Sequence, residues 1–279
     1  MKMYATLMVL TTLSVVWCNQ ILNGQLSCTD DSQCAYVFNT PVKKHGQCPC
    51  LKDAVKYLCN KYATEDMLQS HLIGYYPFDE DILDHSGNER NGAVSGGTLT
   101  FENGVKNQAG KFDGSIKVIV DGFRNFNFGS AFTVSAWFKR TSTSNYQGIV
   151  NSGYYSTGSW EIRMGREFSG EMLGGGVITS DSSITWNYSN LRASVNYWHY
   201  VVMTYDGETL LFYLDGQMQT GDNDCCSGSI QVKPNPVTIG QAGVGTTNEF
   251  FVGLIDEVKL YNTTLSAVEV NALFEEDKP

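Results

Sequence analysis

The stretch Tyr197–Gly216, YWHYVVMTYDGETLLFYLDG, predicts two β-strands joined by a tight turn. The first run, 198–205, is almost wholly aromatic and β-branched, the second, 210–214, is also apolar, and Asp206-Gly207 supplies the turn. Because the first strand carries apolar side chains on both faces, we expect it in the middle of a large layered β structure. The hairpin therefore predicts the fold class, and its aromatic residues are interpreted as core packing.

Composition narrows the class of partner. The chain has 279 residues, enough for one large β-sandwich and a small extra module, with 28 glycines and only 17% charged residues. Its net charge of -10 and sequence pI near 4.8 repel a phosphate backbone, so nucleic acid is not expected as a partner. The same acidity suits divalent cations, or a basic or mineral surface.

Residues 1–18 have the pattern of a secretory signal peptide. Lys2 is the charged head, 4–17 is an apolar run too short for a membrane span, and Val16-Trp17-Cys18 before Asn19 is an acceptable cleavage site. No second run reaches the roughly 18 apolar residues that a membrane span needs, so none is predicted. We expect a secreted, extracellular protein in which disulfides are permitted.

Residues 19–70 are expected to form a separate cysteine-rich, partly helical module. A short secreted segment cannot bury enough core alone, so its cysteine density predicts a disulfide framework. Apolar spacing predicts a helix over 51–62, and a zinc site is the alternative, although the spacing fits no common zinc pattern. The cysteines expected in disulfides are Cys28, Cys34, Cys48, Cys50 and Cys59 here, and Cys225 and Cys226 further along the chain.

Residues 71–274 predict a larger domain of short strands that alternate with Gly, Asn and Ser turns. This regularity indicates an antiparallel all-β sandwich or barrel. Its last element is expected to be a helix with a Ser266–Glu269 capping box, followed by a solvated acidic tail, 275–279. The expected strands are 72–78, 97–102, 111–120, 132–140, 147–152, 159–164, 173–179, 184–189, 198–205, 209–215, 229–233, 236–241 and 251–261.

A series of fragments occurs in one order along this domain: YYPFDE, DHSGNERNG, GKFDG, FTVSAWFK, WHYVVMTYDG, LLFYLDG and GLIDEVKLYNTTLSAVEVNAL. This order resembles the laminin-G-like, concanavalin A-like lectin/glucanase jelly-roll domain of secreted proteins, from Ile73 to Leu273. The resemblance implies a jelly-roll β-sandwich. It implies no single function, because such domains include lectins, adhesion modules, enzyme-appended binding domains and extracellular-matrix proteins.

Asp256 is a candidate calcium ligand. In the strand 254–261, strict alternation places it on the face of Leu254, Val258 and Leu260, so its carboxylate is predicted to point toward the core. The first and last strands of jelly rolls often pair, which would bring it to the loop after the first strand, where oxygen ligands suit structural Ca²⁺. The alternative is a carboxylate bound by backbone N–H groups or an Arg. The predicted ligands are Asp79, Glu80, Asp84 and Asp256, with Asp81 nearby.

Four aromatic residues are candidates for stacking on a sugar ring: Trp137, Trp160, Trp186 and Tyr188. Trp137 lies on the polar face of the strand 132–140, and the other three lie in turn-rich segments. A ring on a polar sheet face binds a sugar or is covered by another segment. Packing is the favoured alternative for all four.

The sequence lacks the catalytic patterns that enzymes of this fold use. A glucanase carries two carboxylates at alternate positions of one strand, whereas Asp256 and Glu257 are adjacent and so point to opposite faces. There is no Gly-x-Ser-x-Gly elbow, and the four histidines are scattered, with His199 interpreted as structural. We therefore expect a protein that is not an enzyme.

Two further sites follow from local patterns. Asn187 and Asn262 begin Asn-x-Ser/Thr glycosylation acceptors. Eight cysteines less Cys18 leave seven, an odd number. One thiol of the adjacent pair Cys225-Cys226 is therefore predicted to reach the N-terminal module or a second chain as a disulfide-linked dimer, unless one stays free or Cys18 is retained.

These observations favour a secreted, non-enzymatic binding or structural protein of an extracellular matrix, with a mineralised matrix as one setting. Matrix proteins, glycans or a mineral surface are the expected partners. A soluble lectin is the first alternative, and a glycan-cleaving enzyme is the second.

Overall fold

The computed structural model describes residues 65, 67–144, 146–153, 157–165, 171–180, 185–220, 226–242 and 249–278, and for residues 185–188 it describes the backbone alone. The chain divides into two compact units, Met1–Ser70 and His71–Pro279, and every described strand belongs to the second. The predicted signal peptide and the helix expected over 51–62 lie outside the described residues. So do six of the predicted disulfide cysteines: Cys28, Cys34, Cys48, Cys50, Cys59 and Cys225.

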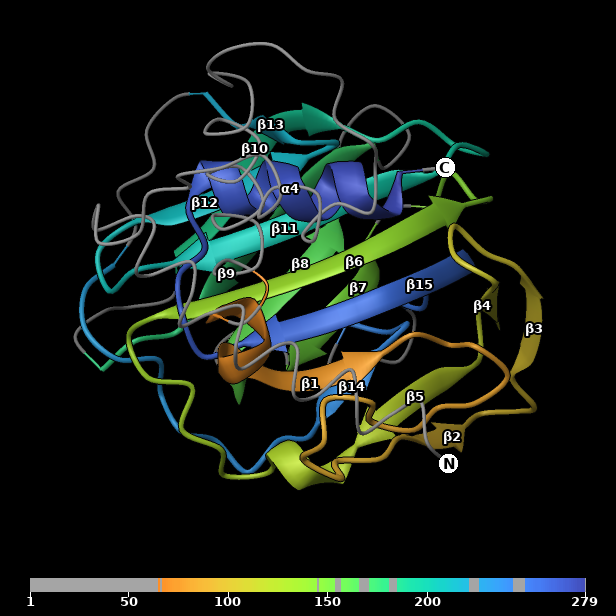
Figure 1. Ribbon diagram of the computed structural model, residues 1–279, viewed down its shortest axis with the longest axis horizontal. Coiled ribbons are helices and arrows are strands. Elements are labelled where there is room, and N and C mark those ends of the chain that lie inside the picture. Colours follow the sequence, from red (N-terminus) through yellow and green to blue (C-terminus); the bar gives the residue numbers. More distant parts are fainter. Residues whose placement is uncertain are drawn as a thin grey trace, which may run out of the picture. The chain divides into compact units, whose positions relative to one another are not determined.

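The second unit is a sandwich of two antiparallel β-sheets, which confirms the fold class predicted from the sequence (Figure 1). One sheet has eight strands in the order β13-β12-β11-β6-β15-β4-β3, with β1 beside β15. Its strands are β1 (Leu72–Tyr76), β3 (Thr100–Asn103), β4 (Gln108–Asp113), β6 (Phe132–Arg140), β11 (His199–Tyr205), β12 (Leu210–Leu214), β13 (Gln217–Met218) and β15 (Val252–Tyr261).

The other sheet has seven strands in the order β10-β9-β8-β7-β14-β5-β2. A 3-10 turn, η1 (Asp121–Phe123), follows β5. None of the helices in the described part of the chain is long and apolar enough to cross a membrane. The strands are β2 (Ala93–Ser95), β5 (Lys117–Val120), β7 (Gln147–Ser152), β8 (Trp160–Met164), β9 (Met172–Val177), β10 (Thr185–Arg192) and β14 (Val237–Ile239).

The predicted hairpin forms β11 and β12, and β11 lies inside its sheet between β12 and β6. Val201, Met203 and Tyr205 face the core between the sheets, and residues on the other face are buried too. In the turn, Asp206 Oδ1 accepts hydrogen bonds from the backbone N–H groups of the two residues after Gly207. The interpretation of this stretch as the central hairpin is confirmed.

Two expected strands differ in the structure. The segment 111–120 is broken into β4 and β5, which belong to different sheets. Asp113 Oδ1 accepts from Ser115 N and Ile116 N, and Gly114 has a φ of 91°, so this corner carries the chain from one sheet to the other. The segment 229–233 contributes only an isolated bridge at Ile230.

The last strand, β15, changes neighbour along its length. Its first part, Val252–Ile255, pairs with β4, and its second part, Val258–Tyr261, pairs with β1. Where the neighbour changes, the register against β6 shifts after Asp256, and Glu257 has a φ of 49°. The strand therefore has a β-bulge at Asp256–Glu257.

This bulge reverses the alternation that the sequence predicts. Val258 and Leu260 face the core, as expected, but Asp256 lies on the outer face, in register with Trp137 of β6. The prediction that Asp256 shares a face with Val258 and points into the core is therefore wrong. The physical reason is the extra residue, which turns one more side chain outward than a regular strand would.

The C-terminal helix α4 (Ala267–Asp277) crosses the outer face of the eight-stranded sheet, over β6 and β11 (Figure 1). Ser266 and Glu269 form the predicted capping box. The expected solvated acidic tail is wrong for Asp277, whose side chain is buried at the end of the helix, whereas Glu275 and Glu276 belong to the helix but are exposed. Two lysines neutralise that carboxylate, which is why it can leave water.

Replacing Ser266 with Ala should weaken α4, because it removes the hydroxyl that caps the helix. We expect a loss of about 1 kcal/mol, and a fall in melting temperature of roughly 2–4 °C for a domain of this size. Val268→Ala is the matched control, since Val268 lies in the same first turn and is 79% exposed. Equal melting temperatures for the two variants would show that the cap contributes nothing.

Candidate functional site

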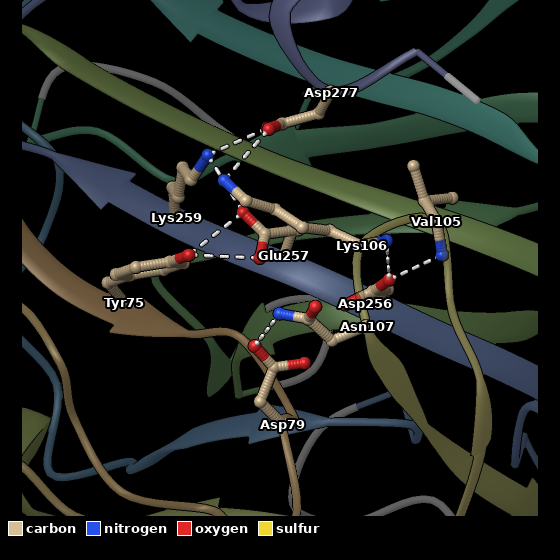
Figure 2. Close-up of polar contacts among 9 residues, drawn as sticks. All are labelled: Tyr75, Asp79, Val105, Lys106, Asn107, Asp256, Glu257, Lys259 and Asp277. Carbon is tan, nitrogen blue, oxygen red and sulfur yellow. Dashed lines mark hydrogen bonds and ion pairs between the residues drawn. The ribbon is translucent and has the colours of Figure 1, made fainter.

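The first predicted site surrounds the turn between β3 and β4. Asp256 Oδ2 accepts hydrogen bonds from the backbone N–H of Val105 at 2.8 Å and of Lys106 at 3.2 Å (Figure 2). A side chain at Gly104 would collide with this oxygen, so the turn approaches closely only because the residue is glycine. For Asp256, the alternative of backbone donors is confirmed.

Asp79, in the loop after β1, binds the other side of the same turn. Its Oδ1 accepts from Gln108 N at 3.0 Å and its Oδ2 accepts from Asn107 Nδ2 at 2.8 Å. The pairing of β1 with β15 therefore brings Asp79 and Asp256 to one turn, as the jelly-roll expectation implied. Amide donors engage three of their four oxygens, and Asp256 Oδ1 has no hydrogen-bond partner among the described residues.

Asp84 and Glu80 are not part of this group. Asp84 accepts from the backbone N–H groups of Tyr75, Ser86 and Arg90, so it closes its own loop. Glu80 is exposed. In the described part of the chain, no three His, Cys, Asp or Glu side chains lie close enough to hold a metal ion. The four predicted ligands are thus not assembled, which leaves Asp79 and Asp256 as the pair on which a calcium site would have to be built.

The Asp256 carboxyl group titrates unusually. Burial raises its pKa to about 7, although the backbone N–H groups of Lys106 and Val105 oppose the rise. The adjacent Glu257 carboxylate adds to it by repulsion. Asp256 is therefore close to half protonated at neutral pH.

A buried ionic network beside the bulge joins β1, β15 and α4 (Figure 2). Tyr75 Oη donates to the Glu257 carboxylate at 2.9 Å, and Lys259 Nζ lies 3.0 Å from Glu257 and 2.9 Å from Asp277. Lys106 Nζ reaches the other Asp277 oxygen at 3.3 Å. Burial alone would lower the pKa of Lys259, but the two carboxylates raise it well above its usual value. Lys259 therefore stays charged, and the network fixes α4 to the sheet.

Sequence reasoning missed a second polar group, on the outer face of the seven-stranded sheet. Glu161 and Arg163 project from β8 on the side away from the core, and Asn151 of β7 lies in register with Glu161. Arg163 Nη1 is 3.5 Å from Glu161 Oε1 and 2.8 Å from Glu249 Oε2. In the sequence, WEIRM alternates like any strand with one solvated face. Only the fold shows that Glu161 is 1% exposed.

Glu161 is an unusual carboxyl group. Neither of its oxygens has a hydrogen-bond partner among the described residues, although Arg163 lies close by. Burial raises its pKa to about 8, with Arg163 acting in the opposite direction. At neutral pH the group is mainly protonated, so it can both donate and accept a hydrogen bond.

Two of the predicted sugar-stacking residues are packing residues. Trp137 is buried under α4, with its ring centroid 5.6 Å from that of Phe274 and 5.2 Å from that of Tyr200. Trp160 lies in the core between the sheets, beside the rings of Phe128 and Phe132. The prediction of sugar stacking is wrong for both, because neither ring is exposed. The packing alternative is confirmed for them.

The remaining predicted residues stay predictions. Trp186, Asn187 and Tyr188 lie in β10, and their side chains are outside the description. Asn262 is exposed in the turn after β15, with its Oδ1 2.9 Å from His71 Nδ1, so the acceptor is accessible but its glycosylation is untested. Cys226 is in a disulfide whose partner lies outside the described residues. Because that partner cysteine is not described, the expected disulfide-linked dimer stays a prediction.

Comparison with known families and structures identifies the fold. A family described as the concanavalin A-like lectin/glucanases superfamily matches residues 110–271, more than half of the chain. No curated protein matches the sequence. The β-sandwich is similar to domain 4 of AbnA, a GH43 extracellular arabinanase from Geobacillus stearothermophilus, solved in complex with arabinotriose. The two share 20% identity over 73% of this chain and 98% of that chain, with a TM-score of 0.59.

Toxin domains have the same fold. The binding domain of Paraclostridial Mosquitocidal Protein 1 is 19% identical, covers 75% of this chain and matches over 53% of its own, with a TM-score of 0.57. The botulinum neurotoxin serotype D binding domain is 15% identical over the same shares, with a TM-score of 0.56. The chain thus spans about half the length of these toxin structures. At such identities the likeness establishes the fold alone.

Asp256→Asn should flatten the dependence of stability on pH. The folded pKa of Asp256, about 7, lies above its unfolded value of 3.8, so the folded state holds the extra proton between these pH values. The stability it contributes is therefore present below about pH 4 and lost as pH rises to about 7. Asn keeps an acceptor for the turn but cannot ionise. The stability lost between pH 5 and pH 8 is about 2.6 kcal/mol, so we expect the drop in melting temperature over this range to shrink by roughly 5–10 °C; an unchanged drop would contradict a titrating Asp256.

Thermal melts in calcium and in EDTA test the predicted metal site. Because amide donors already engage three of the four oxygens of Asp79 and Asp256, we expect the two melting temperatures to agree within about 1 °C. A bound ion at about 100 times its dissociation constant would instead add roughly 2.7 kcal/mol. A rise of several degrees that Asp256→Ala abolishes would establish the calcium site.

Proposed function

The chain belongs to the concanavalin A-like lectin/glucanase superfamily, and from this premise we propose that it is a secreted binding protein of the extracellular matrix that holds a glycan on its β-sandwich without cleaving it. Two features of the comparisons support a binding role. The arabinanase domain of the same fold was solved with arabinotriose, and the similar toxin structures are binding domains.

The two outer faces of the sandwich differ in what they offer a ligand. The face of the eight-stranded sheet is covered by α4, whose Phe274 lies on Trp137 and Tyr200. The face of the seven-stranded sheet instead carries hydrogen-bonding groups, among them Glu161 and Arg163. We assign the glycan to the seven-stranded sheet.

The observation that carries this assignment is the Glu161 carboxyl group. An unsatisfied buried polar group costs about 1–3 kcal/mol, and Glu161 has two oxygens without a hydrogen-bond partner among the described residues. A sugar hydroxyl both donates and accepts, so it is matched to a protonated carboxyl group. Glu161 is 1% exposed, so a ligand reaches it only by displacing what covers this face, and binding would then satisfy both oxygens.

The charge of the chain favours neutral glycans over acidic ones. The net charge of -10 repels sulfated or carboxylated sugars over long range. Arg163 is the cation beside Glu161, and its guanidinium already contacts Glu161 and Glu249. Little of its positive charge is therefore left for an anionic ligand.

Strand β9 supplies a strip without side chains between β8 and β10. Gly174 and Gly176 lie on it and are buried, so a flat ring would meet the backbone there once the same face is opened. The register then sets polar residues on one flank and aromatic residue types on the other, the combination that hydroxyl groups and the C–H face of a sugar require. Across the three strands the register runs Glu161–Gly176–Trp186 and Arg163–Gly174–Tyr188.

The same geometry favours binding over cleavage. Glycosidases act with two carboxyl groups, one as acid and one as nucleophile or base. Here Arg163 Nη1 contacts both Glu161 and Glu249, so the two carboxyl groups are tied to one cation. We therefore expect no hydrolysis of glycosidic bonds at this face.

The extracellular setting rests on the signal-like residues 1–18 and the cysteine density that follows them. Matrix glycans are the partners that fit the Glu161 face. The acidic surface also suits a basic protein or a mineral of the matrix, which would bind by charge and be released by salt.

Glycan arrays printed with neutral and acidic saccharides test the proposal. We expect neutral glycans to bind, and Glu161→Ala to lower affinity by about tenfold or more, because alanine removes both the donor and the acceptor of the protonated carboxyl group. Trp186→Ala should weaken the same glycans by a comparable factor. Glu102→Ala is the control, since Glu102 is a half-exposed carboxylate of the other sheet.

Three results would argue against the proposal. An array without any bound glycan would reject glycan binding altogether. Equal affinities for Glu161→Ala and Glu102→Ala would move the site away from the seven-stranded sheet. Release of reducing sugar from the bound glycan, lost in Glu161→Gln, would make the protein a glycan-cleaving enzyme.

A further inference from the structure

Ser194, His199 and Asp215 form a hydrogen-bonded chain at one end of the sandwich. Ser194 Oγ lies 3.2 Å from His199 Nε2, and His199 Nδ1 lies 2.7 Å from Asp215 Oδ2. The other Asp215 oxygen accepts from the backbone N–H of Tyr200 at 2.8 Å. Ser194 is exposed, whereas the His199 side chain is 12% exposed. The hydrogen-bonded side chains thus lead from a fixed carboxylate, through a largely buried imidazole, to a hydroxyl at the surface.

Separate elements position the three groups. His199 begins β11, and its ring lies 5.9 Å from that of Phe138 on the neighbouring β6. Asp215 follows β12, so the hairpin brings the end of β12 beside the start of β11. Ser194 lies in the connection that leaves β10 of the seven-stranded sheet and enters β11 of the eight-stranded sheet. The group therefore lies where the chain crosses between the sheets.

The backbone around Ser194 is held by the buried Arg140. Arg140 Nε donates to Ala193 O at 3.0 Å, and the N–H of Asn196 donates to Arg140 O at 2.8 Å. The N–H groups of Ser194 and Val195 donate to no acceptor among the described residues. Two backbone donors next to the hydroxyl are therefore available to an oxygen of a ligand.

The carboxylate sets the tautomer of the imidazole. An ionised carboxylate only accepts hydrogen bonds, so His199 Nδ1 carries the proton and donates it to Asp215. In the neutral ring Nε2 is then an acceptor, and the Ser194 hydroxyl donates to it. This order of groups activates a serine hydroxyl: a general base beside the nucleophile, oriented by a third group.

We propose that Ser194 and His199 are the catalytic residues of a site that cleaves carboxylic esters, with Asp215 as the residue that positions His199. Ser194 Oγ forms a bond to the ester carbonyl carbon while its proton passes to His199 Nε2, and the carbonyl electron pair moves onto the oxygen. That pair returns as the bond to the alcohol breaks, and the alcohol takes the proton from Nε2. Water then repeats both steps on the acyl-serine, with Ser194 Oγ as the leaving group, to give the acid.

The position of the hydroxyl indicates the class of substrate. Ser194 is exposed on a connection between strands, so it meets esters carried on the outside of a larger molecule. A small acyl group, such as acetyl, needs no deep pocket to reach it. The site is distinct from the Glu161 face, and its failure would leave the proposed glycan binding untouched.

A structural role for His199, which the sequence predicts, would explain its bond to Asp215 but not its contact with Ser194. The His199–Asp215 bond ties the start of β11 to the end of β12 whatever Ser194 does. It does not require a serine on the other ring nitrogen. A structural bond therefore predicts loss of stability in His199 variants, whereas catalysis predicts a reactive Ser194.

A fluorophosphonate probe and p-nitrophenyl acetate separate these roles on the full-length protein. We expect covalent labelling at Ser194 by peptide mapping, and transfer of an acetyl group to the same residue. Ser194→Ala should abolish both, and Asp215→Asn should slow labelling of Ser194 by at least about 100-fold at a temperature where the variant is still fully folded. Ser115→Ala is the control, because Ser115 is an exposed serine that bonds to a carboxylate, Asp113, without an imidazole.

The proposal is overturned by any of three results. These are no labelling of the folded protein, equal labelling of Ser115 and Ser194, or ester hydrolysis that Ser194→Ala leaves unchanged. Ser194→Ala alters only an exposed hydroxyl, so its melting temperature should match that of the parent protein. Labelling confined to Ser194 and slowed in Asp215→Asn supports the proposal.

Discussion

The bulge at Asp256–Glu257 is the constraint on which the eight-stranded sheet depends. Strand β15 pairs with β6 along one edge, and along the other edge it pairs first with β4 and then with β1. Asp256 and Glu257 lie between these two pairings, at the bulge, and both carboxylates bind groups on the outer face. Asp256 binds the β3–β4 turn, and Glu257 binds Tyr75 and Lys259. A regular strand would send one of these charges into the core, at a cost that nothing there offsets.

The outer faces of the two sheets differ in what covers them. Because α4 covers β6 and β11, Trp137 and the outward residues of β11 are part of a third layer. The outer face of the seven-stranded sheet has polar groups in place of such an apolar layer, and Glu161 is the member whose hydrogen-bonding capacity is unused among the described residues. The difference between the faces, more than any single residue, is the reason for assigning the proposed glycan to the seven-stranded sheet.

Local patterns in the sequence were sufficient for the sandwich, the central hairpin and the capping box of α4. Each depends on neighbours within a few residues, such as the turn at Asp206. The bulge could not be predicted from the sequence, because the residues around Asp256 alternate as a regular strand does. The burial of Trp137 could not be predicted either, because it depends on a helix about 130 residues later along the sequence. Alternation along a strand predicts which face of the sheet a side chain is on, but it does not predict which other segment covers that face.

The candidate sites follow the same division. Asp79 and Asp256 were predicted to meet, since pairing of the first and last strands is a property of the fold. The amide donors that engage them belong to a turn that the spacing of carboxylates does not reveal. Ser194 and Asp215 carry no local signature at all, because their relation to His199 exists only once β10, β11 and β12 are in place.

The network from Tyr75 to Asp277 also decides how the domain would carry force. It joins the first strand, the last strand and the end of α4 through Glu257 and Lys259. Tension applied through the segments before β1 and after α4 would therefore be borne by these neighbouring elements of one sheet. The seven-stranded sheet would stay outside the load path. If the protein has the proposed matrix role, its proposed ligand face would stay unstrained while the chain on either side is pulled.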